Sequence, residues 1–498
     1  MGVGGHASGP VADLAIVGAG PAGLAAADTA ARAGLRVLLL DGAAHPGGQY
    51  WRGPDPALGA RRPERLHHHR ADRARLLAAL DAHRRTGAVR FLPGRQVWAV
   101  TGEAGAWTVH TTATVPAGTG VGGEGGSDAG LTVLPARALL LAAGAFERQH
   151  PFPGWTLPGV LGAGGAQALL KGQLVVPGRR VVVAGTGPLL LAVADSLAAA
   201  GVRVPAVVES AGAGDWLRRA GALLRSPDKL VEGARFGLGL ARRATRVLTG
   251  HAVVAAHGTD RVEAVTVARV DGSGRPVPGT GRRVPCDALA VGHGLLPRLD
   301  LAVTLGCAVR TGPDGAPALR VDGRQATDVP GIWAAGETCG VAGVGAALAE
   351  GEIAALAVAG RPVPAGALRR RDRQREFADA VATVHRPRPG AVAALPAHTE
   401  VCRCEGVTAG EIRTAAADLG GGDVRTVKLL TRAGMGWCQG RTCGPTVAAL
   451  CGRPPTPDRR PLADPVPLSE LAALAPAPAP GPVSVSVPGV ARGGDAAS

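Results

Sequence analysis

The chain has 498 residues, a formal net charge of +15 and only 3% aromatic residues. Its length allows two or three domains, each with its own buried core. Of its 54 basic residues only Lys171, Lys229 and Lys428 are lysines, and the arginines are spread among Ala, Gly and Pro. Because proteins that bind single-stranded nucleic acids stack bases on aromatic side chains, this composition argues against a nucleic-acid partner.

A dinucleotide-binding unit is predicted at the N-terminus. A buried strand at 13–17 runs into a glycine motif, an alanine-rich helix and a second strand at 37–40 that ends in an acid. Gly18 makes the tight turn, Gly20 lets the backbone approach a pyrophosphate, and Gly23 allows the helix to pack closely. Asp41 lies 23 residues after Gly18, where it can accept ribose hydroxyls while the helix N-terminus faces the pyrophosphate.

A second unit of the same kind is predicted from about residue 180. A strand leads into Gly185 and Gly187, a helix follows, and a strand at 206–208 ends in Glu209. Leu190 takes the place of the third glycine, so helix and strand approach less closely. If a nucleotide binds, Glu209 would repel a 2′-phosphate and favour NAD over NADP. A domain that binds no nucleotide is the alternative, since a fold does not fix a function.

A third element follows further along the chain. Residues 331–337 predict a strand that ends in a glycine turn with an acid, followed by a helix of small residues. Such a turn can present Glu337 to the polyol hydroxyls of a flavin while the helix N-terminus faces its phosphates. A plain strand, turn and helix is the alternative.

Four cysteines near the C-terminus predict an inorganic redox centre. They form two pairs, Cys402 with Cys404 and Cys438 with Cys443, and 33 residues separate the pairs. Four thiolates are what an iron–sulfur centre requires. Zinc accepts the same ligands, but its usual spacing has at least two residues between paired cysteines, so a cluster fits better.

The order of two dinucleotide units and then an acidic turn resembles the flavoproteins with two dinucleotide-binding domains that are related to glutathione and thioredoxin reductases. This resemblance predicts an α/β fold with two Rossmann-like domains, one for FAD and one of NAD(P)-binding type, to which the cysteines add a small helical [2Fe–2S] domain. The chain has no cysteine before Cys286, which argues against the disulfide chemistry of those reductases.

Five shorter motifs narrow the resemblance. They are Pro46-Gly-Gly-Gln49, Phe152-Pro-Gly-Trp-Thr-Leu-Pro-Gly-Val160, Gly164-Gly-Ala-Gln167, Gly185-Thr-Gly-Pro-Leu-Leu190 and Val401-Cys-Arg-Cys-Glu405. Together they resemble the flavoprotein subunit shared by opine oxidases, hydrogen cyanide synthase and hydroxyproline dehydrogenases, with relatives in the large subunit of heteromeric sarcosine oxidase. The likeness runs from about residue 12 to about residue 452, and the C-terminal part is similar to the bacterioferritin-associated ferredoxin module.

The resemblance implies the cofactor contacts. The implied cluster ligands are the four paired cysteines, and the implied flavin contacts are Gly18, Gly20, Gly23, Asp41, Gly48, Gln49 and Glu337. One departure from the family is Tyr50-Trp51-Arg52 in place of Ile-Tyr-Arg after Gln49. No histidine or carboxylate pair stands beside the flavin motifs as a base, so no catalytic residue is assigned.

The predicted domains follow from these elements. The flavin domain takes residues 12–150 and 285–360, and the second dinucleotide domain is inserted at 178–284. A linking segment at 361–397 leads to the cluster module at 398–452. The tail at 453–498, rich in Pro and Ala, is expected to be disordered or available for docking. The run His67-His68-His69 is expected to be exposed.

Three functions are compatible with these observations. In the first, which we favour, the chain is the FAD and [2Fe–2S] electron-transferring subunit of a heteromeric amino-acid or imino-acid dehydrogenase or oxidase. A second flavoprotein subunit then oxidises the carbon–nitrogen bond of the substrate, and the electron acceptor is not identified. In the second, the chain is a self-sufficient NAD(P)H-dependent reductase that passes electrons to a protein acceptor. In the third, the nucleotide units are structural and the cysteine module is a docking domain.

The expected location is the cytoplasm, with attachment to a membrane through a partner as the alternative. The first ten residues lack the basic and apolar regions of a signal peptide, and the most apolar window, 181–200, is interrupted by Gly185, Gly187 and Asp195. Thiolate ligands of a cluster also suit a reducing compartment.

Overall fold

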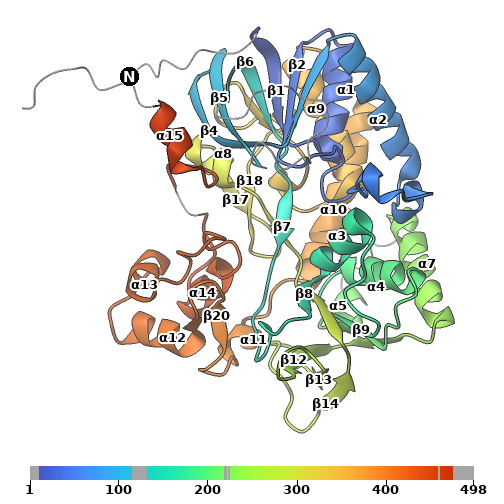
Figure 1. Cartoon of the computed structure of the whole chain (residues 1–498), viewed down its shortest axis with the longest axis vertical. Coiled ribbons are helices and arrows are strands. Elements are labelled where there is room, and N and C mark those ends of the chain that lie inside the picture. Colours follow the sequence, from blue (N-terminus) through green and yellow to red (C-terminus); the bar gives the residue numbers. More distant parts are fainter. Residues whose placement is uncertain (1–9, 115–131, 218–220, 222–224, 458–459, 475–498) are drawn as a thin grey trace, which may run out of the picture.

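The computed structural model describes residues 10–114, 132–217, 221, 225–457 and 460–474. Its two large sheets lie one above the other in Figure 1, and the small C-terminal module lies beside the second sheet. Parts of the predicted tail, 458–459 and 475–498, fall outside the described residues. The predicted α/β class is confirmed.

The first sheet has the strand order β3-β2-β1-β6-β5-β4, with β19 paired to β6. Its strands β1, β2, β3, β6 and β19 are parallel neighbours, whereas β4, β5 and β6 pair in antiparallel fashion. The bounds are β1 Ala12–Val17, β2 Val37–Asp41, β3 Val89–Pro93, β4 Arg95–Glu103, β5 Ala106–Ala113, β6 Thr132–Leu141 and β19 Ile332–Ala334.

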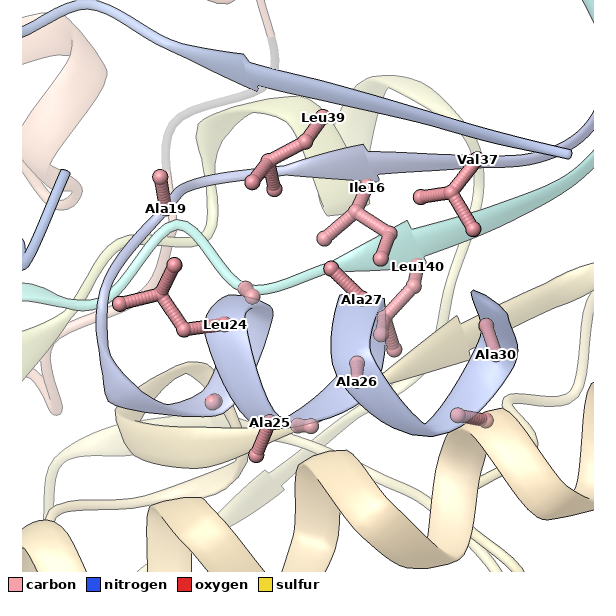
Figure 2. Packing of buried hydrophobic residues seen from close by; sticks show 14 of the residues in the cluster. Ile16, Ala19, Leu24, Ala25, Ala26, Ala27, Ala30, Val37, Leu39 and Leu140 are labelled. Carbon is pink, nitrogen blue, oxygen red and sulfur yellow. The ribbon is translucent and has the colours of Figure 1, made fainter. Parts of the chain in front are cut away.

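Small residues let two helices pack closely over this sheet. Figure 2 shows α1 (Pro21–Arg32) lying on β1, β2 and β6, with Ile16, Leu39 and Leu140 in the core. Helix α9 (Gly343–Val358) packs on α1 so tightly that a Cβ at Gly351 would lie 2.2 Å from the carbonyl oxygen of Ala22. This packing holds the end of β19 near the first glycine motif. The remaining helices of this half are η1 Pro56–Leu58, η2 Pro63–Leu66, α2 Arg70–Arg85, α8 Asp300–Thr304, η3 Gly336–Cys339 and α10 Ala365–Val384.

The second sheet is fully parallel, with the strand order β11-β10-β9-β15-β8. Its strands are β8 Val160–Gly162, β9 Val181–Gly185, β10 Ala206–Glu209, β11 Arg246–Thr249 and β15 Ala288–Gly292. The helices of this half are α3 Ala163–Gln173, α4 Leu189–Ala199, α5 Ala213–Leu217 and α7 Pro227–Arg242. An antiparallel sheet of β12 His251–His257, β13 Ala264–Arg269 and β14 Arg282–Pro285 adjoins it.

The predicted limits of the second unit, 178–284, differ from the sheet. Strand β8 precedes residue 178 and β15 follows residue 284, yet both belong to the second sheet. The prediction missed both strands for physical reasons. Strand β8 has only three residues, and β15 pairs with β9, a strand far away in the sequence, so local patterns do not indicate their sheet. Two short strands, β7 Ala145–Glu147 and β16 Leu295–Pro297, pair where the chain crosses between the halves. Strands β17 Val309–Thr311 and β18 Pro317–Leu319 form a separate hairpin.

The C-terminal module is built mostly from short helices around its own core. Its elements are α11 Pro389–Ala393, β20 Glu400–Cys402, β21 Val407–Thr408, α12 Ala409–Ala417, α13 Val424–Thr431 and α14 Gly444–Leu450. The core contains Val401, Ile412, Val427 and Val447. Thr408 and Glu411 form a capping box at α12, and Asp423 caps α13.

Part of the predicted disordered tail is ordered. Residues Leu468–Leu474 form α15, which Figure 1 shows beside β4 and β5. Asp464 accepts hydrogen bonds from Gln96, Arg298 and Arg441, so polar contacts fix the segment that precedes the helix. For this stretch the structure agrees with the expected availability for docking and not with disorder, because contacts with residues far away in sequence hold it in place. Within the described residues, none of the helices has the length and apolarity needed to cross a membrane.

Candidate flavin and cluster sites

The first glycine motif leaves no room for a side chain at Gly18 or Gly23. Gly18 has φ +109°, and a Cβ there would lie 2.3 Å from the carbonyl oxygen of Ala142. A Cβ at Gly23 would lie 1.8 Å from the carbonyl oxygen of Gly18. Gly20 is the N-cap of α1, and no side chain caps this helix end. The turn therefore offers backbone N–H groups and a positive helix end to an anion such as a pyrophosphate.

Asp41 ends β2 beside this turn. Its carboxylate accepts the backbone N–H of Ala19 at 2.6 Å and that of Ala43 at 2.7 Å. Burial raises the pKa of Asp41, and the two backbone hydrogen bonds oppose that rise. A carboxylate has about four acceptor positions, so these two bonds leave capacity for a ribose diol.

The loop after β2 comes back to the glycine motif. A Cβ at Gly48 would lie 2.9 Å from the Cα of Gly20, so the two turns touch. Gln49 is exposed and accepts a hydrogen bond of 2.8 Å from Arg52. The structure thus brings the predicted residues 18–23, 41, 48 and 49 together.

Sequence reasoning missed Arg52 as a functional candidate. Its Nε is buried and has no hydrogen-bond partner within the described part of the chain, and its charge acts on Asp41. An unpaired guanidinium nitrogen next to the glycine turns suits the anionic diphosphate of a dinucleotide. The sequence offered one signal for Arg52, its position three residues after Gln49. Sequence reasoning treated residues 50–52 only as a departure from the family and assigned no contact to Arg52.

The acidic turn packs against the first turn of α1. Glu337 follows β19, is partly exposed, and accepts the N–H of Gly343 at 3.3 Å. Gly336 has φ +77°, and a Cβ there would lie 3.0 Å from the Cβ of Ala22. The acid predicted to hold flavin hydroxyls therefore lies over the same helix end as the first glycine motif.

A buried ion pair fixes this turn. Arg375 of α10 contacts Glu350 of α9 through two bonds of 2.6 and 2.7 Å, and Glu350 is only 1% exposed. Arg375 also donates to the carbonyl oxygens of Gly340 and Gly336, while Glu350 accepts the N–H of Gly336 at 2.8 Å. No local pattern indicates this pair, because its partners lie 25 residues apart on two helices.

The second glycine loop has the expected turn but a different environment. Gly185 has φ +130°, and a Cβ there would lie 1.8 Å from the carbonyl oxygen of Gly292. Glu209 accepts three hydrogen bonds of 2.8 Å, from the hydroxyl of Thr186 and the N–H groups of Gly187 and Ala211. The chain itself uses most of the acceptor capacity that a ribose would need.

All four predicted cluster cysteines line one cavity of about 220 Å³. Its walls also include Trp155, Gly162 and Arg403. The thiols of Cys402 and Cys443 lie close enough to interact, and so do those of Cys404 and Cys438. Burial and the neighbouring Cys402 raise the pKa of Cys443.

The backbone around the cavity is adapted to these sulfurs. The N–H of Gly434 points to the Cys402 sulfur at 3.5 Å, and a Cβ at Gly436 would lie 2.1 Å from the Cβ of Cys404. Where the structure is described, no three Cys, His, Asp or Glu side chains gather closely enough to hold a single metal ion. A tetrahedral zinc needs four thiolates within about 2.3 Å of one ion. Four thiols that face one cavity and interact within and between the pairs form the ligand set of a [2Fe–2S] centre.

One prediction about the surface was wrong. His67 was expected in an exposed run, but it is buried, and neither ring nitrogen has a partner among the described residues. Burial and the nearby Arg73 and Lys171 lower the pKa of His67 to about 4. The 3₁₀ turn η2 directs the chain inward at this point, whereas His69 is exposed.

Two family models match the chain. The model of the pyridine nucleotide-disulphide oxidoreductases matches residues 12–360, and the model of the BFD-like [2Fe-2S] binding domain matches residues 400–452. The predicted cofactors are thereby supported, FAD for the first part and a [2Fe–2S] cluster for the second.

Individual relatives cover nearly the whole chain. It is 36% identical over 453 residues to the HcnB subunit of hydrogen cyanide synthase from Pseudomonas aeruginosa, covering 86% of this chain and 90% of the relative. It is 35% identical over 453 residues to the A subunit of opine oxidase from Rhizobium meliloti, covering 88% and 92%.

A solved structure shares the fold. L-proline dehydrogenase from P. horikoshii matches with a TM-score of 0.62 and 19% identity, covering 93% of this chain and 79% of that one. The resemblance stated from the motifs is thereby confirmed: the chain belongs to the pyridine nucleotide-disulphide oxidoreductase family, within the group that includes HcnB and the A subunit of opine oxidase.

Proposed function

We propose that this chain is the FAD and [2Fe–2S] electron-transferring subunit of a heteromeric oxidoreductase that acts on the CH–NH or CH–NH₂ group of an amino or imino acid. The observation that carries the proposal is the cavity lined by four paired cysteines in a chain that also holds a flavin-type glycine turn. A bound flavin accepts a hydride or single electrons, and an iron–sulfur centre carries single electrons.

The residues that would hold the two cofactors follow from the geometry. Gly18, Gly20 and Gly23 would form the pyrophosphate turn. Asp41 would accept the ribose, and Glu337 would accept the polyol of the flavin. The neighbouring residues Gly48, Gln49 and Arg52 would complete the flavin site. The cluster would take Cys402, Cys404, Cys438 and Cys443, with the Gly434 N–H donating to one ligand sulfur.

The names of the relatives support a partner. HcnB and the opine oxidase relative are each described as one subunit of an enzyme, and the chain covers about nine tenths of their lengths. A further match, 31% identical over 363 residues, is the alpha subunit of sarcosine oxidase from Rhizobium meliloti, of which the chain covers 31%. We therefore place the amine-oxidising site on a second flavoprotein subunit.

The competing function is a self-sufficient NADH-dependent reductase. The glycine turn at Gly185 and Gly187 favours it, because this turn has the backbone form of a dinucleotide site. The three hydrogen bonds already accepted by Glu209 weigh against it.

An anaerobic visible spectrum of the isolated, FAD- and iron-loaded chain separates the two. The electron-transferring subunit should keep its flavin absorbance after addition of NADH, sarcosine or hydroxyproline, and should lose it after dithionite. Rapid bleaching by NADH would contradict the proposal and favour the reductase. Rapid bleaching by an amino or imino acid would place the oxidising site on this chain and remove the need for a partner.

A further inference from the structure

The end of helix α10 lies across the second glycine loop. His385 directly follows α10, and its Nδ1 lies 2.9 Å from the hydroxyl oxygen of Thr186 and 3.6 Å from Glu209. Its ring packs edge-on against Trp216, with 5.5 Å between the ring centroids. The imidazole thus faces the acid that would accept the ribose of a dinucleotide in this fold.

The linker that follows, residues 385–390, is fastened further along the same domain. Arg388 forms an ion pair of 2.5 Å with Asp215 and donates to the carbonyl oxygens of Asp271 and Gly272 at 3.3 Å. The N–H of Gly390 donates to the carbonyl oxygen of Ser273 at 2.9 Å. These bonds tie the linker to α5 and to the hairpin between β13 and β14.

The two acids of the two dinucleotide units differ in their contacts. Within the described residues Asp41 accepts two hydrogen bonds, both from the backbone, whereas Glu209 accepts three and also faces the His385 imidazole. With about four acceptor positions on a carboxylate, Asp41 retains two and Glu209 retains one. A ribose diol needs two acceptor positions, one for each hydroxyl group.

The space left beside the linker is small. The cavity lined by Thr186, Ser210, His293 and Arg386 measures about 120 Å³. Pockets for ligands of cofactor size usually have volumes of about 300–1,000 Å³. This cavity is therefore too small for a dinucleotide while the linker is in place.

We propose that the second glycine loop is the docking site of the chain's own linker, residues 385–390, and not of a nicotinamide dinucleotide, and that this docking positions the cluster module. The proposal rests on the proposed function and deepens it. Helix α11 begins at the end of the linker, β20 follows at Glu400, and Trp155 of the second half donates to the Glu400 carbonyl oxygen at 2.8 Å. The second half thus holds the chain at two points before Cys402, one in the linker and one at Glu400.

The first test is calorimetric titration of the full chain, loaded with FAD and iron, with NAD⁺ alone. We expect no binding up to about 1 mM, the upper end of common substrate ranges. Saturable NAD⁺ binding below that concentration overturns the inference. Binding without bleaching by NADH overturns the inference alone, while bleaching by NADH overturns the proposed function as well, so the two failures are distinguishable.

The second test asks whether the linker positions the module. In the double variant His385→Ala/Arg388→Ala we expect amide exchange at residues 386–398 to rise by about tenfold or more, because charge-assisted hydrogen bonds are lost. The FAD and iron contents should not change. The control is His257→Ala, which removes an imidazole bonded to Thr266 in the same domain but away from the linker. Unchanged exchange in the double variant overturns the inference, as does an equal rise in the control.

Discussion

Arg375 shows how one buried residue supports a site that it does not line. Its guanidinium contacts Glu350 and two carbonyl oxygens of the turn that carries Glu337. Removing one partner of a buried ion pair leaves the other charge unpaired in a medium of low polarity, which is far more costly than losing an exposed pair.

We predict that Arg375→Ala lowers the free energy of unfolding by about 3–5 kcal/mol. The variant should also lose most of its FAD, because the acidic turn is released. Arg373→Ala is the matched control, since Arg373 is exposed on the same helix. The measurements are the denaturation midpoint and the ratio of FAD to protein. Full FAD content in Arg375→Ala would show that the ion pair does not hold the turn.

Because Lys171 is buried, the free energy of unfolding should increase as the pH rises above about 8. Its side chain is 5% exposed, and burial lowers its pKa from 10.5 to about 8. Below pH 8 lysine is protonated in both states and the full burial penalty applies. Between pH 8 and 10.5 the unfolded chain holds the extra proton, so stability increases as pH rises.

Replacing this lysine should therefore stabilise the protein at neutral pH. We expect Lys171→Met to raise the free energy of unfolding at pH 7 by up to about 3 kcal/mol, and this gain should shrink between pH 8 and pH 10.5. Urea denaturation of both proteins at pH 7 and pH 10 measures the difference. A gain that is absent at pH 7, or equal at both pH values, contradicts this account of Lys171.

The thiols lining the cavity give a chemical prediction. Cys438→Ser should lose most of the bound iron and keep FAD, because hydroxyl oxygen is a poor ligand for an iron–sulfur centre and the flavin turn lies elsewhere. Cys451→Ser is the control, since Cys451 does not line the cavity. Iron and flavin analysis of both variants decides. Equal iron loss in the two variants would argue against the assigned ligands.

At the scale of elements, local sequence rules predicted what local geometry requires. Gly18, Gly23 and Gly185 were identified because any side chain there would collide with backbone, a restriction that the motif spacing records. Asp41 was placed by its distance of 23 residues from Gly18, and Glu337 by the glycine turn that ends a predicted strand. Limits set by tertiary pairing, such as the inclusion of β8 and β15 in the second sheet, could not be read from local patterns.

Helix caps in the cluster module also obey local rules. The side chain of Asp423 accepts the N–H groups of Arg425 and Thr426 at the start of α13. Asp423→Ala should destabilise the module by about 1 kcal/mol. Asp418→Ala removes the same charge at the C-cap of α12 and serves as control. The temperature at which the cluster absorbance is lost measures the effect, and equal values for the two variants would contradict a capping role.

At the scale of the whole molecule, the cluster module is held by parts far away in sequence. The linker after α10, Trp155 and the segment around Asp464 each connect it to another region. The sequence predicted the module and its cysteines, because two pairs of cysteines at this spacing are typical of an iron–sulfur centre. Their position relative to the flavin half depends on arginine pairs such as Arg441 with Asp300, which no spacing rule records.

We propose above that this one chain carries a flavin and a [2Fe–2S] cluster, which exchange electrons without NADH. The most direct measurement is low-temperature electron paramagnetic resonance of the isolated chain after anaerobic photoreduction of its flavin, with iron and zinc quantified on the same sample. We predict about two irons per chain and the signal of a reduced [2Fe–2S] cluster. Zinc in place of iron, or a reduced flavin with no cluster signal, would contradict it.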